Sequence, residues 1–258
     1  MNQSWRRPAL GVLLAIAITT AMDAIGLSAF SALPLLPLMG LFWYLERLSR
    51  TEIGFVSGRV RHYGLALFHP VLVLGLAALT ASITGVINLE STDWRKAGLN
   101  LALVTLSTIL VVTVTEEGFF RGWLWASLKR ADQNKLRVLV WSSLAFAAWH
   151  LSAVLLETGF NPPLAQVPIF LVNAAVLGAI WGMLRLISGS VVAASVSHGV
   201  WNGVAYVFFG FGDEVGALRI EETAIYGPEV GALGLALNLV FAVVLWQRCA
   251  REGPMAAA

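Results

Sequence analysis

The chain has 258 residues, of which 58% are hydrophobic and 12% charged, whereas soluble domains carry roughly 25% charged residues. This composition excludes an ordinary soluble fold and indicates a protein that lies within a lipid bilayer. The net charge of +2 is small and the basic residues are spread over several loops. Because nucleic-acid binding needs a one-sided basic surface, we expect no nucleic-acid partner. The single Cys249 excludes an internal disulfide and a CxxC motif.

A membrane-spanning helix needs about 20 largely apolar residues, and eight segments approach this length. They follow one another too closely to leave room for a globular unit. We therefore predict a single integral membrane domain over residues 1–258, an all-α polytopic transmembrane bundle of about eight spanning helices. The second segment is short and contains Pro34 and Pro37, so it either spans fully or is re-entrant. The segments are 9–30, 32–46, 65–88, 99–125, 138–157, 164–186, 190–211 and 230–247.

The loops between these segments alternate in charge. Thirteen Lys and Arg residues fall on one side of the predicted bundle and three on the other. Because cytoplasmic loops are rich in Lys and Arg, we expect a multi-pass protein of a bacterial cytoplasmic membrane with both termini in the cytoplasm. The polar segment 49–64 is predicted to form an amphipathic helix at the cytoplasmic interface. The opposite side collects acidic residues, interpreted as solvated loops: Glu90, Asp93, Glu157, Asp213, Glu214, Glu221, Glu222 and Glu229.

Ionisable side chains within the hydrocarbon layer are costly unless they are paired or hydrated, so each one is a candidate functional residue. The fourth, fifth and seventh predicted spans all carry such residues. Counted at about 1.5 Å per residue from the cytoplasmic ends, Glu116 lies at a depth of roughly 15 Å, His150 at roughly 20 Å and His198 at roughly 12 Å. We therefore expect three helices to bring polar groups to a similar level.

Helical spacing assigns these residues to different faces. Glu117 and Arg121 are four apart with the acid first, which favours an ion pair. Glu116 points about 100° away and has no helical partner, which suits a general base. His198 and Asn202 are also four apart, so both can direct hydrogen-bond donors at one point, as the stabilisation of an oxyanion requires.

Two further features of the spans bear on the site. Phe146 is four residues before His150, so its ring shares a helix face with the imidazole and can pack against it. Asp23 lies in the first span and is either a hydrogen-bonded packing residue or part of a route for the substrate.

Three motifs occur in order along the chain: EExxxR from Glu116, FxxxH ending at His150, and HxxxN from His198 to Asn202. With these motifs the sequence resembles the CPBP intramembrane proteases, which include CAAX prenyl endopeptidases and bacteriocin-processing or self-immunity proteins. The resemblance places a CPBP-like catalytic core at residues 99–211.

The resemblance implies that water hydrolyses a peptide bond of a membrane-associated protein or peptide, with no cofactor. Glu116 corresponds to the family's catalytic glutamate, which activates water together with the histidine matched by His150. His198 and Asn202 correspond to the pair that stabilises the oxyanion. The supporting positions of the motif are Glu117 and Arg121.

Two alternatives stay open at this point. A zinc-dependent membrane metalloprotease is possible because two histidines with carboxylates can ligate zinc, although the sequence contains no HExxH motif. A non-catalytic adaptor or transporter-like protein could carry the same polar cluster. A prenylated C-terminal peptide, a bacteriocin leader and a C-terminal sorting tag fit equally well as substrates, and the side of substrate entry and the oligomeric state are likewise open.

Overall fold

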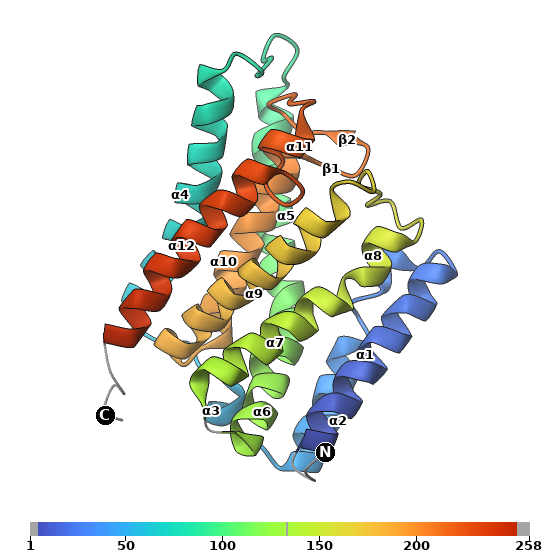
Figure 1. Cartoon of the computed structure of the whole chain (residues 1–258), viewed down its shortest axis with the longest axis vertical. Coiled ribbons are helices and arrows are strands. Elements are labelled where there is room, and N and C mark those ends of the chain that lie inside the picture. Colours follow the sequence, from blue (N-terminus) through green and yellow to red (C-terminus); the bar gives the residue numbers. More distant parts are fainter. Residues whose placement is uncertain (1–4, 133, 252–258) are drawn as a thin grey trace.

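The computed structural model describes residues 5–132 and 134–251 as a bundle of helices (Figure 1). Eight helical segments are long and apolar enough to cross a membrane, so the all-α polytopic fold is confirmed. The second segment, Ser28–Glu46, is long enough to span fully. The elements are α1 (Arg6–Ala24), η2 (Ser28–Phe30), α2 (Leu35–Glu46), α3 (Arg50–Ile53), α4 (Val60–Ile83), α5 (Trp94–Val114), η3 (Gly118–Leu124), α6 (Trp125–Ala131), α7 (Lys135–Trp149), α8 (Leu151–Leu155), α9 (Val167–Ser188), α10 (Val191–Val204), η4 (Ala205–Phe209), β1 (Gly210–Phe211), β2 (Glu214–Val215), α11 (Thr223–Tyr226) and α12 (Ala232–Arg251).

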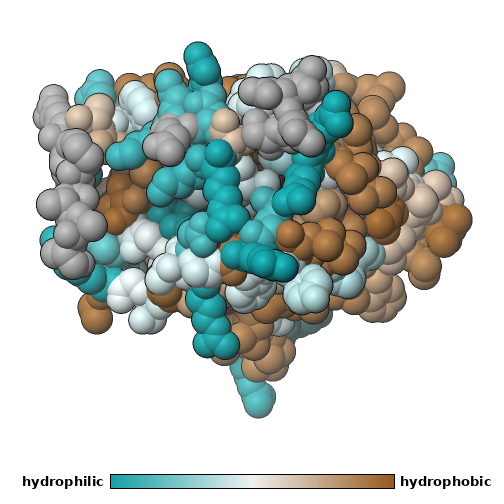
Figure 2. Space-filling model, turned by 90° about the horizontal axis from the view of Figure 1, so that it is seen from below, coloured by the Kyte–Doolittle hydropathy of each residue, from teal (hydrophilic) through white to brown (hydrophobic). Residues whose placement is uncertain are grey.

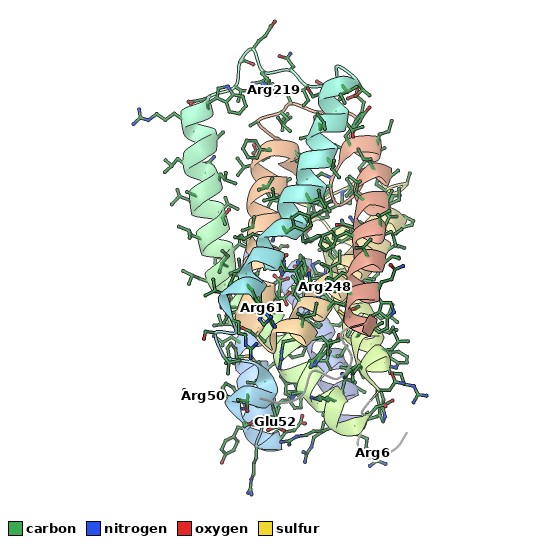
Figure 3. The ribbon with its side chains drawn as sticks, turned by 90° about the vertical axis from the view of Figure 1, so that its left-hand side faces the viewer. Arg6, Arg50, Glu52, Arg61, Arg219 and Arg248 are labelled. Carbon is green, nitrogen blue, oxygen red and sulfur yellow. The ribbon has the colours of Figure 1, made fainter. Side chains whose placement is uncertain are left out.

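The two ends of the bundle differ in charge. Figure 3 shows Arg6 and Arg50 toward one end, Arg61 and Arg248 between that end and the middle, and Arg219 at the other end. Seen from below in Figure 2, hydrophilic side chains gather across the middle of the first end and hydrophobic ones lie toward its rim, as expected for a bundle surrounded by lipid. We call the end that contains residues 47–59 and 189–190 the arginine-rich end, and the end that contains residues 84–93, 156–166 and 210–231 the acidic end.

The predicted interfacial helix over residues 49–64 does not form as one helix, because this segment contains a single turn, α3, and then the first residues of α4. Ser49 caps this turn by accepting a hydrogen bond from the backbone of Glu52, whose side chain accepts one from the backbone of Ser49 in return. The carboxylate of Glu52 accepts hydrogen bonds from the backbone N–H and from the hydroxyl of Ser49, and these two bonds are the main reason why its pKa is lowered to about 2. Gly54 then ends the turn at a φ of +82°, and a Cβ there would lie 2.4 Å from Nε of Arg185. The chain therefore packs against α9 instead of continuing as a surface helix.

The fourth span is interrupted near its middle, directly before the two acids. Thr115 has φ −106° and ψ −95°, which are not helical angles. The chain then resumes as a helix and winds as a π-helix over Gly118–Leu124, every residue of which is buried. Such π-helical turns are found mostly at functional sites. The interruption turns a single 38-residue span, Trp94–Ala131, into a lipid-facing half and a buried half.

Close packing between α5 and α10 fixes the helix that carries His198. A Cβ on Gly199 would lie 2.3 Å from Cγ1 of Ile109, and one on Gly203 would lie 2.0 Å from Oγ1 of Thr105. Small residues at this interface let the two backbones approach closely, as is common between membrane helices. At the acidic end, a short antiparallel hairpin of β1 and β2 follows α10, and this hairpin has no counterpart in the sequence-based expectations.

Candidate active site

One cavity of about 220 Å³ lies between α1, α7, α9 and α10. The carboxylate of Glu116 reaches this cavity from the break at Thr115, and the imidazole of His150 reaches it from the C-terminal end of α7. A second imidazole and an amide come from α10. The structure therefore brings all four predicted catalytic residues to one cavity wall: Glu116, His150, His198 and Asn202.

His150 is held by its own helix. Its Nδ1 lies 2.9 Å from the carbonyl oxygen of Phe146, and the two rings meet edge to face at 4.5 Å between centroids. The predicted packing of these side chains is confirmed. Because a carbonyl oxygen only accepts, Nδ1 carries the proton and donates, so Nε2 of a neutral ring is left with a lone pair for a group in the cavity.

His198 is fixed by two buried partners that the sequence did not indicate. Its ring stacks on Trp181 at 3.8 Å between centroids, and its Nδ1 lies 3.0 Å from Oε1 of Glu117. Since an ionised carboxylate only accepts, Nδ1 donates to Glu117. The Nε2 atom lies 3.9 Å from Oε2 of Glu116, which is longer than a hydrogen bond.

Glu117 and Arg121 form the predicted ion pair, with 3.1 Å between Oε1 and Nη1 and both side chains fully buried. The guanidinium also lies over the ring of Phe146, with Cζ 4.2 Å from the ring centroid, a cation–π contact. A Cβ on Gly178 would lie 3.0 Å from Nη2 of Arg121, so glycine leaves room for the guanidinium. Neither charged residue of the pair lines the cavity. The predicted divergence of Glu116 from Glu117 is thus confirmed.

Glu229 lines the cavity, although the sequence placed it among solvated loop residues. It precedes α12, and its Oε1 accepts a hydrogen bond of 3.1 Å from Nε1 of Trp201. Burial raises the pKa of Glu229 to about 7, partly offset by the hydrogen bond from Trp201 and by His198. No sequence pattern points to this position, because an acid in a polar loop between spans is ordinarily hydrated.

Asp23 also lines the cavity, from the opposite wall on α1. It is only 4% exposed, and its Oδ2 has no hydrogen-bond partner among the described residues. Of the two interpretations given to Asp23, a side chain that faces the cavity with an unpaired oxygen favours the substrate route over packing. A nearby wall is held by Thr19, which donates to the carbonyl oxygen of Ser31 and accepts from Nε1 of Trp149.

No group of three His, Cys, Asp or Glu side chains within residues 5–132 and 134–251 is arranged as a set of metal ligands. The cavity instead presents its carboxylates and imidazoles from separate helices, without a direct hydrogen bond between Glu116 and His150 in this part of the chain. A water molecule that bridges two such groups would complete their hydrogen bonding.

Residues 98–204 match the profile of the family described as type II CAAX prenyl endopeptidase Rce1-like. The matched region contains all three motifs, from Glu116 to Asn202. No curated protein and no solved structure matches the chain. The match confirms the resemblance to the CPBP and CAAX proteases and, together with the eight apolar helices, supports an integral membrane protein of the intramembrane endopeptidase kind.

Proposed function

We propose that the protein is a glutamate-dependent intramembrane endopeptidase in which Glu116 is the general base. The observation that carries this proposal is the single cavity shared by Glu116, His150, His198 and Asn202. It lies within a bundle whose helices exclude bulk water, where preorganised polar groups act more strongly than in water. The substrate is a membrane-associated protein or peptide.

The two adjacent acids differ in their ability to accept a proton. Glu117 is fully buried, and Oε1 lies 3.1 Å from Nη1 of Arg121 and 3.0 Å from Nδ1 of His198. These two contacts hold the carboxylate of Glu117 in the buried layer, outside the lining of the cavity. The side chain of Glu116 is 15% exposed, and within residues 5–132 and 134–251 its one polar contact is the 3.9 Å approach to His198, so its lone pairs are available to a water molecule.

The hydrolysis follows from these positions. Water lies between the carboxylate of Glu116 and Nε2 of His150 and loses a proton to Glu116 as its oxygen attacks the carbonyl carbon of the substrate. The oxyanion that forms is stabilised by donors from His198 and Asn202. The tetrahedral intermediate then collapses, the C–N bond breaks, and the proton held by Glu116 passes to the departing amine.

His198 can serve the oxyanion in only one protonation state. Its Nδ1 already donates to Glu117, so Nε2 donates to the substrate only when the ring carries both protons. The ion pair of Glu117 with Arg121 therefore contributes to the reaction in this proposal, since it holds the acceptor of Nδ1 in place.

The test uses the purified protein in detergent and a panel of membrane-tethered peptides. Wild type is compared with Glu116→Gln, and Glu222→Gln, an exposed acid at the acidic end, is the matched control. We expect cleavage by wild type and the control and none by Glu116→Gln. Equal cleavage by all three would rule out the glutamate mechanism. Loss of cleavage with a chelator, restored by zinc, would favour the metalloprotease, and no cleavage of any peptide would favour an adaptor.

A further inference from the structure

The active-site cavity carries more acid than hydrolysis requires. Beside Glu116 it is lined by Asp23 and Glu229, and its described lining contains neither Lys nor Arg. The nearest guanidinium charge, on Arg121, lies outside the lining and is already paired with Glu117. Two carboxylates thus line the cavity without a role in the reaction, and the described lining offers them no Lys or Arg.

A second cavity borders the first on the side of the acidic end. It has a volume of about 410 Å³ and shares with the first cavity Phe160, Tyr206, Phe211 and Glu229. Its other lining residues come from the loops of the acidic end, and the part of the chain that the structure describes contributes no Lys or Arg to it. The acids that line it besides the shared one are Asp213, Glu214 and Glu221. The two cavities therefore adjoin at these shared residues, and acidic side chains line both of them.

A buried polar network holds the backbone at Glu229, the acid that both cavities share. The carbonyl oxygens of Pro228 and Glu229 accept hydrogen bonds of 2.8 and 3.2 Å from Nδ2 of Asn173. Oδ1 of Asn173 accepts one of 3.0 Å from Asn238, which is in turn hydrogen-bonded to His69 on α4. Buried polar groups are costly unless they are fully satisfied. Three helices thus fix the position of one loop carboxylate.

The unpaired Oδ2 of Asp23 indicates that the acidic lining is incomplete without a ligand. A buried acceptor without a donor is costly, and this cost is removed when a donor arrives with the substrate. A positively charged donor is favoured most, because the attraction between opposite charges is strengthened in a cavity of low dielectric constant.

We propose that Asp23 and Glu229 form a subsite for a Lys or Arg side chain of the substrate, and that this side chain enters from the acidic end. The proposal deepens the proposed function, since it names the substrate class of the same cavity. Its charge selection is a property of binding, so it can be tested in a protein that does not cleave.

The binding test uses full-length Glu116→Gln protein in lipid nanodiscs and fluorescent membrane-tethered peptides that differ only in Lys or neutral norleucine at one position. We expect Lys to bind about tenfold more tightly than norleucine at one position or two adjacent ones. Adding Asp23→Asn and Glu229→Gln is expected to reduce this preference to about threefold or less, whereas adding Glu222→Gln leaves it unchanged.

The norleucine peptide is the internal control for folding, since its affinity is expected to be the same in every variant. Each single substitution is measured as well, so that a poorly folded double variant does not decide the outcome. Equal binding of Lys and norleucine peptides at every position, or a preference that survives both substitutions, would overturn the subsite. If wild type cleaved none of the peptides, the proposed function would fail but this binding result would stand.

The entry route is tested without any peptide. In a Cys249→Ser background, Ser31→Cys places a thiol in the cavity wall, and membrane-impermeant cationic and anionic methanethiosulfonates are added to one side of sealed vesicles. We expect Ser31→Cys to react from the same side as Glu222→Cys and about tenfold faster with the cationic reagent. Reaction from the side that labels Arg130→Cys, or faster reaction with the anionic reagent, would overturn the proposal.

Discussion

The buried layer around Arg121 and the cavity beside it contain similar side chains, but these side chains differ in how they are paired. In the buried layer, Glu117 is fully enclosed and lies close to Arg121 and His198. In the cavity, Glu116 makes one long contact and Asp23 keeps an unpaired oxygen. Opposite charges meet in the buried layer, whereas the described lining of the cavity contains carboxylates and no Lys or Arg. A buried ionisable group is costly in a membrane protein unless it is paired or hydrated, so the comparison distinguishes the structural ion pair from the groups that are placed to meet a substrate.

The largest expected effect is on the cleavage rate, through Glu116 in the cavity. Glu116→Gln keeps the shape of the side chain and removes its ability to accept a proton, so we expect the cleavage rate to fall by up to about 10⁴-fold. The midpoint of thermal unfolding in detergent is expected to stay at the wild-type value. Both the cleavage rate and the unfolding midpoint are measured on the same preparation. A clear fall in the midpoint beside the fall in rate would contradict the comparison.

Substitutions in the ion pair of Glu117 and Arg121 are expected to lower the free energy of unfolding. Arg121→Met leaves Glu117 buried without its cation, and removing one partner of such a pair costs about 3–5 kcal/mol. Adding Glu117→Gln to Arg121→Met should restore much of this loss. The measurement is the free energy of unfolding by denaturant in micelles, and a double variant less stable than Arg121→Met would contradict the pairing.

A smaller effect is expected from the oxyanion donors. Asn202→Ala removes one donor and should lower the turnover number by about 10²–10³-fold. The apparent affinity for the peptide should change much less, because the donor acts mainly on the transition state. A change confined to affinity would instead make Asn202 a substrate-binding residue.

The smallest predicted effect is a pH dependence of charge selection. The pKa of Glu229 is raised to about 7, so this carboxyl is mostly protonated at pH 6 and mostly ionised at pH 8. The preference for Lys over norleucine peptides should therefore grow severalfold as the pH rises through about 7. His150, His198 and Asp23 also face the cavity, so the Glu229→Gln variant is the control, in which this rise should disappear.

The spans and the helix faces could be predicted because both depend on local rules. Hydropathy locates an apolar segment, and four-residue spacing brings Glu117 to Arg121 and Phe146 to His150. The contact between Glu117 and His198 could not be predicted, since it joins residues 81 apart on helices whose rotation is set by packing. The position of Glu229 in the cavity lining could not be predicted for a similar reason, because its loop packs against the bundle only in the tertiary structure.

The central claim is that two adjacent glutamates have separate roles, and one crossed comparison tests it most directly. The cleavage rate and the unfolding midpoint are measured for Glu116→Gln and Glu117→Gln under identical conditions. We predict that Glu116→Gln loses cleavage at an unchanged midpoint, whereas Glu117→Gln lowers the midpoint because Arg121 is left uncompensated. Cleavage retained by Glu116→Gln, or a lowered midpoint in Glu116→Gln alone, would contradict the account.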